Sequence, residues 1–95
     1  MPYVTETDRR YVDAVLGNLL DCIKVRCFEA GHLNYLVTSL AAAYIEQHGK
    51  QYENINAAVG ALECAKLELY RRVAAPYEDT KIAANGDVYP ASIKT

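Results

Sequence analysis

The sequence predicts an all-α fold, and two observations support it. Apolar residues recur at steps of three and four in three successive segments, which is the spacing of one helix face. No segment alternates apolar and polar residues over a length that would suit a half-buried strand. We therefore expect one single helical domain over residues 1–95, with main helices at about 6–26, 32–48 and 52–75, a short helix after Pro76 and an extended C-terminal tail.

The first helix begins with a capping pattern. Thr5 precedes Asp8 by three residues, a spacing that suits an N-terminal cap. Behind it runs an apolar stripe that consists of Val12, Val15, Leu16, Leu19, Leu20 and Ile23.

The second helix follows a break in the pattern at "CFEAG", which ends at Gly31. Gly49 stands where a C-terminal cap with a positive φ belongs, so we expect the helix to end there. Its apolar stripe consists of Leu33, Leu36, Val37, Leu40, Ala41 and Tyr44.

The third helix has two contrasting faces. One carries a ridge of Ile55, Ala58, Val59, Leu62, Ala65, Leu69 and Val73, and the other carries the small residues Ala57, Gly60, Ala61, Cys64 and Ala75. A glycine inside a helix costs about 1 kcal/mol relative to alanine, so close approach by another backbone is one reason to tolerate Gly60. A solvent-exposed face of short side chains is the alternative. On the first interpretation, Gly60, Ala61 and Cys64 form a homo-oligomer interface of at least a dimer.

Pro76 interrupts the third helical pattern. It cannot donate a hydrogen bond to the carbonyl of Arg72 and it disfavours helix at Ala75, so we expect a kink or a stop. Proline also suits the first turn of a new helix, and "NG" at 85 and 86 predicts that this short helix ends there.

Composition narrows the class of protein. The net charge is -2 and the pI is about 5.6, with basic residues spread along the chain, so nucleic-acid binding is not expected. The longest uncharged apolar run, residues 33 to 45, is shorter than the roughly 20 residues that cross a bilayer, so we expect no membrane span.

The three cysteines include no CxxC pair and the N-terminus lacks the apolar core of a signal peptide, which favours a reducing cytoplasm. Eight tyrosines supply amphipathic rings that suit interfaces.

Motifs of catalysis are not found. The sequence has no glycine-rich phosphate loop, no GxSxG, no HExxH and no Glu-x-x-Glu pair, so we expect no enzyme, no catalytic residue and no cofactor. Cys27 and His32 are close in sequence, but a zinc site needs four convergent ligands, and we expect no metal.

Two short stretches are candidates for ligand binding. His32, Asn34 and Tyr35 open the second helix, where unpaired amides favour anions. The alternative there is a capping asparagine with a solvated histidine and a packed tyrosine.

Around Pro76, an arginine could bind a phosphate or carboxylate while a tyrosine ring stacks on a base. The alternative is an ion-pair network that holds the short helix against the long one, with one arginine paired to Glu68. The residues concerned are Tyr70, Arg71, Arg72 and Tyr77, with Glu78 and Asp79 in a supporting role.

The chain resembles a family of small, functionally uncharacterised phage, prophage and bacterial proteins. The resemblance spans nearly the whole chain, including the opening "MPYVTETDRR", and contains two family elements. The first is G-x-LNY, on Gly31, Leu33, Asn34 and Tyr35, where His32 replaces the more usual acid. The second is YRR-x-x-APYED, on Tyr70, Arg71, Arg72, Ala75, Pro76, Tyr77, Glu78 and Asp79, and it continues as KI-x-x-NGDVY. The resemblance implies no catalytic residue.

Three functions remain open. The phage setting suggests, by analogy, a homo-oligomer that sequesters a small anionic, nucleotide-type ligand in evasion of host defence. A structural or regulatory protein-protein interaction module without a small ligand is the second, and a nucleotide-processing enzyme is the third.

Overall fold

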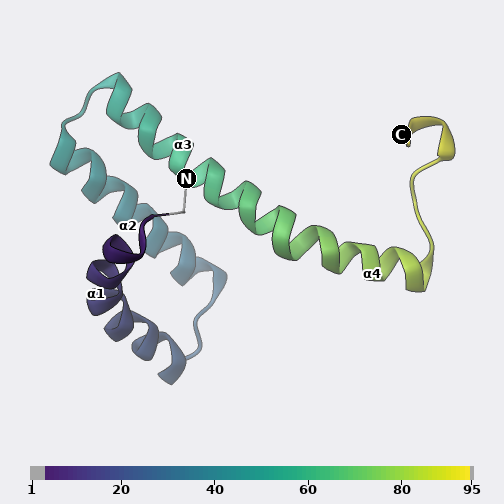
Figure 1. Cartoon of the computed structure of the whole chain (residues 1–95), viewed down its shortest axis with the longest axis horizontal. Helices are drawn as coiled ribbons and strands as arrows, with labels where there is room; N and C mark the ends of the chain where they lie inside the picture. The colour runs from purple at the N-terminus through teal and green to yellow at the C-terminus, as the bar shows by residue number, and fades with distance from the viewer. Residues whose placement is uncertain (1–3, 95) are drawn as a thin grey trace. The chain divides into compact units, whose positions relative to one another are not determined.

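The computed structural model describes residues 4–94, and every regular element in that range is helical (Figure 1). The helices are α1 (Glu6–Val25), α2 (Ala30–His48), α3 (Tyr52–Leu69) and α4 (Ala75–Asn85). A π-helical segment, η1 (Tyr70–Ala74), joins α3 to α4, and a short 3-10 turn, η2 (Ala91–Ile93), follows in the tail. The all-α prediction is confirmed, with no strand among these residues.

The chain divides into two compact units, Met1–Ala61 and Leu62–Thr95, with the boundary inside α3. The first unit holds α1, α2 and the first part of α3. The second holds the rest of α3, then η1, α4 and the tail. The expectation of a single domain stays a prediction.

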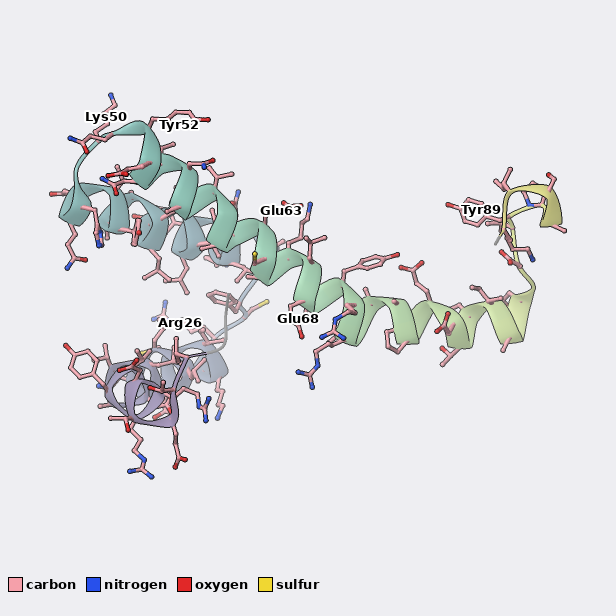
Figure 2. The ribbon with its side chains drawn as sticks, turned by 45° about the horizontal axis from the view of Figure 1, so that its top comes forward. Arg26, Lys50, Tyr52, Glu63, Glu68 and Tyr89 are labelled. Atoms are coloured by element: carbon pink, nitrogen blue, oxygen red, sulfur yellow. The ribbon has the colours of Figure 1, made fainter. Side chains whose placement is uncertain are left out.

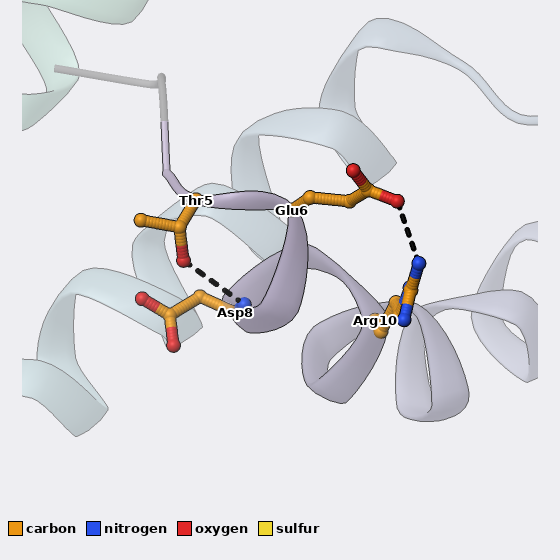
Figure 3. Close-up of polar contacts among 4 residues, drawn as sticks. All are labelled: Thr5, Glu6, Asp8 and Arg10. Carbon is orange, nitrogen blue, oxygen red and sulfur yellow. Dashed lines mark hydrogen bonds and ion pairs between the residues drawn. The ribbon is translucent and has the colours of Figure 1, made fainter.

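In the first unit, α1 begins at the predicted cap. The Thr5 hydroxyl accepts a hydrogen bond of 3.2 Å from the backbone N–H of Asp8, as Figure 3 shows. Arg10 then pairs with Glu6 at 2.6 Å, one turn apart on the helix surface. Cap and pair together explain why the helix starts at Glu6.

The α2–α3 turn depends on Gly49 and Asn54. Gly49 has a φ of 108°, which side-chain-bearing residues rarely adopt, and its N–H bonds to the carbonyl of Ile45 at 2.7 Å. The Asn54 side chain donates to the carbonyls of His48 at 3.1 Å and Gly49 at 2.9 Å. The predicted C-terminal cap at Gly49 is therefore confirmed. Asn54, from α3, adds hydrogen bonds to the last carbonyls of this turn.

In the second unit, the helix continues through Pro76, contrary to the expected stop. Ala75 is right-handed helical (φ -62°, ψ -47°), although it precedes a proline. Its N–H donates to the carbonyl of Tyr70, five residues back, as in a π-helix. The wider turn makes room for the proline ring and removes the need for the N–H that Pro76 lacks. As a result, α4 has no free N-terminus.

The tail is folded rather than simply extended. Gly86 ends α4 with a φ of 90° and an N–H bond of 2.8 Å to the carbonyl of Ile82, as the "NG" pair predicts. Asp87 then accepts from the N–H of Tyr89 at 3.0 Å and from Nζ of Lys94 at 3.0 Å. These two bonds bend the chain back through η2.

Most side chains of residues 4–94 are exposed, and Figure 2 draws them as sticks along the ribbon. Ala58, on the predicted ridge of α3, is the only buried residue among those that the structure describes. Each of the four α-helices exposes at least two large apolar or tyrosine side chains. None of the helices between residues 4 and 94 combines the length and apolarity needed to cross a bilayer.

Candidate functional site

The N-terminus of α2 is closed by Glu29 and His32. The backbone N–H of Glu29 donates to Nδ1 of His32 at 3.0 Å, and the Glu29 side chain accepts from the backbone N–H of His32. This is a capping box in which a histidine takes the place of the usual glutamate or glutamine. Because Glu29 caps the helix, α2 begins at Ala30, two residues before the predicted start.

This cap changes the anion site expected at α2. The amide of His32 is already bonded to a carboxylate, and that negative charge sits at the positive end of the helix dipole. A phosphate placed there would be repelled by Glu29. The cap is therefore Glu29 with His32, and not Asn34.

His32 also contacts the end of the preceding loop. Its ring stacks on Phe28 with 5.8 Å between centroids, and both rings line a shallow hollow beside the last turn of α1. The other lining residues are Leu19, Cys22, Ile23, Arg26 and Cys27. His32, Asn34 and Tyr35 are all exposed.

The second group of candidates lies in the second unit, where α3 passes into η1. Glu68, labelled in Figure 2, accepts from Arg71 at 2.8 Å and lies 3.7 Å from Arg72. The carboxylate side chain is only 23% exposed, whereas the two arginine side chains are 72% and 61% exposed. Both arginines thus converge on one acid within their own helix, where only one such pair was expected.

Tyr70 and Tyr77 are exposed near these arginines in sequence, and Tyr77 has a cation on one face. Nζ of Lys81 lies 5.3 Å from the centroid of the Tyr77 ring, within the range of a cation–π interaction. A base could stack on that face only by displacing Lys81.

Glu78 and Asp79 were expected in the first turn of an independent helix. Because η1 continues directly into α4, these acids follow a helical turn instead of occupying a free positive end. The two candidate stretches belong to different units, so a shared site remains a prediction.

The small-residue face of α3 is open to solvent in the single chain. Gly60 and Ala61 are exposed and Cys64 is half-buried. A Cβ added at Gly60 would meet no atom within 4 Å outside the helix's own backbone. No backbone of the described chain therefore approaches Gly60.

The residues from 4 to 94 contain no group of three His, Cys, Asp or Glu side chains placed to hold a metal ion. Cys22, Cys27 and Cys64 are free thiols.

One family model, described as a domain of unknown function and called DUF6899, matches residues 1–88. The chain belongs to the DUF6899 family. No curated protein and no solved structure matches it. The DUF6899 match includes both groups of candidate residues and ends within the Asp87 bend.

Sequence reasoning missed two polar contacts of this DUF6899 protein. The Glu29–His32 cap has the three-residue spacing of a capping box, but with an acid first and a histidine in the return position. The Asp87 bend lies directly after the helix-ending "NG", in a segment expected to be extended. An aspartate two residues before a backbone donor is a signal for such a turn.

Proposed function

We propose that this DUF6899 protein is a non-enzymatic helical homo-oligomer that serves as a protein-protein interaction module. The observation that supports the proposal is the exposure of large apolar side chains within the second unit. Leu69 is 62%, Val73 60% and Tyr77 61% exposed, although all three lie on the one long helix of that unit.

A helix gains most of its stability by packing an apolar face against a neighbour, and a chain as short as this one often gains further stability by association. Exposed apolar side chains occur on every α-helix, and burying them in an assembly would stabilise the folded state.

The mass of the purified full chain in solution tests this proposal. We expect light scattering at tens of micromolar to give a multiple of 10.5 kDa. The unfolding midpoint should rise with protein concentration, because association stabilises only the folded state. A folded monomer with a concentration-independent midpoint would contradict the proposal.

A second candidate function is the binding and sequestration of a small anionic ligand of nucleotide type. The observation that favours it is the exposed Arg71 within η1. A guanidinium has five N–H donors, and Arg71 donates to Glu68 while most of its side chain faces solvent. π-Helical turns are rare and are frequently found at functional sites. The ligand would bind at Tyr70, Arg71, Arg72 and Tyr77.

Calorimetry with inorganic phosphate and with linear and cyclic nucleotides tests the second candidate. The Arg71→Ala variant should lose about 2 kcal/mol of binding free energy, while Arg71→Lys keeps the charge but loses the bidentate geometry. Unchanged helicity in both variants would separate binding from folding. No heat with the wild type would leave the interaction module as the function.

A further inference from the structure

We infer that two copies of this chain pair antiparallel along the continuous α3–η1–α4 helix of the second unit, centred near Arg72. This inference rests on the proposed self-association and specifies its surface. The partner is a second copy, and the pairing is isologous, so each copy presents the same residues.

The surface is an apolar stripe of Leu62, Leu69, Val73 and Tyr77. Each of these side chains is between 42% and 62% exposed. The second unit contains no other long helix, so within that unit nothing packs against the stripe. A helix gains most of its stability from packing an apolar face, so the stripe is a surface that a second copy can cover.

The π-helical segment η1 keeps the side chains of the stripe on one side of the helix. Leu69, Val73 and Tyr77 are spaced by four residues, and in a regular α-helix each such step turns the side chain by about 40° around the axis. The i→i+5 turn at η1 takes up one extra residue and compensates for this drift. Val73 lies inside η1, so the three side chains share one face of the helix.

The register follows from charges on one flank of the stripe. Glu63 and Lys81 lie nine residues on either side of Arg72, and Lys66 and Glu78 lie six residues on either side. An antiparallel pair centred on Arg72 therefore brings Glu63 level with Lys81 of the second copy, and Lys66 level with Glu78. Opposite charges meet at all four positions, as at the flanking positions of coiled coils.

In the same register, apolar side chains of the two copies alternate along the shared axis. At the centre, Val73 of one copy lies between Val73 and Leu69 of the other. Tyr77 of each copy falls between Leu62 and Leu69 of its partner. Arg72 of both copies lies at the same level, each beside its own Glu68, which offsets the like charge.

Cysteine cross-linking of the full chain, with its three native cysteines replaced by alanine, tests the pairing. Val73→Cys should form a disulfide-linked dimer within minutes of mild oxidation. Leu62→Cys should not, because the two positions would be about 30 Å apart along the antiparallel axis. Cross-linking of both variants would indicate a parallel pair and overturn the inference. An oligomer in which Val73→Cys fails to cross-link would overturn the surface but keep self-association, whereas a monomer would overturn the proposed function itself.

Charge reversal tests the register independently. Lys66→Glu and Glu78→Lys should each raise the dimer Kd by roughly three- to tenfold, since each change breaks two rim pairs. The double variant should return to within about threefold of the wild type, because the opposite charges meet again. Lys24→Glu, on α1, is the matched control and should leave the Kd unchanged. A double variant no better than the single ones would exclude this register.

Discussion

Glu29 and His32 hold each other at the start of α2, with the N–H of Glu29 3.0 Å from Nδ1 of His32. The contact needs Nδ1 as an acceptor, so the ring carries its proton on Nε2 when neutral. His32 is thus engaged within the chain, at the position where the sequence suggested a ligand contact.

Removing this cap should destabilise the first unit. Glu29→Ala is expected to lower the free energy of unfolding by about 0.5–2 kcal/mol, the usual loss for an N-terminal cap. His32→Gln should retain most of the stability, because glutamine can make the same return bond. Thermal unfolding followed by circular dichroism measures both. Asn34→Ala is the control, and a loss there equal to that of Glu29→Ala would show that Asn34 is the cap.

Pro76→Ala should convert η1 into ordinary α-helix. Alanine restores the N–H at position 76, so the N–H of Ala75 is expected to move from the carbonyl of Tyr70 to that of Arg71. The local helix should become more stable, since proline is the least favourable helix residue.

Self-association should nevertheless weaken in this variant, because Val73 and Tyr77 lose their alignment. Amide hydrogen exchange at residues 70–80 measures the first effect, and light scattering measures the second. Association that strengthens together with helicity would contradict the role given to the π-helical turn.

Substitutions at Gly60 test whether the small-residue face of α3 is exposed to solvent or packs against another copy. Gly60→Ala should stabilise the single chain by up to about 1 kcal/mol, since a Cβ there meets no atom within 4 Å. Gly60→Leu should reduce assembly only if another copy packs closely on this face, at a cost of about 1–3 kcal/mol. Sedimentation of the two variants side by side tests this. Unchanged association in Gly60→Leu would assign Gly60, Ala61 and Cys64 to solvent.

The bend at Asp87 should depend on pH. The hydrogen bond from the Tyr89 N–H lowers the pKa of Asp87, and the bond from Lys94 lowers it further. A lowered pKa in the folded state means that the bend is stabilised above the ordinary aspartate value of about 4, and that this stabilisation is lost as the pH falls through the lowered value.

The amide resonance of Tyr89, followed by NMR between pH 6 and 2, should report that transition. Asp87→Asn is the matched control, because it keeps an oxygen acceptor for the Tyr89 N–H but has no charge to lose. A titration that persists in Asp87→Asn would assign it to another group.

The sequence by itself determined the helices and most of their ends. Thr5, Gly49 and "NG" at 85–86 act through local geometry: a hydroxyl three residues before an amide, and glycines that tolerate positive φ. Such signals involve neighbours along the chain, so they can be read without knowing the fold. Apolar periodicity located the helix bodies for the same reason.

Only the three-dimensional structure shows how the chain passes Pro76 and how α2 is capped, although both features depend on contacts between residues close in sequence. The competition between a helix stop and a π-helical turn depends on how the backbone from Tyr70 to Ala75 shares its hydrogen bonds, and proline statistics favour the stop. At α2, several polar residues compete for the cap, and the side-chain geometry selects Glu29 with His32. Both outcomes are set by small differences between alternative hydrogen-bond arrangements, which residue types do not encode individually.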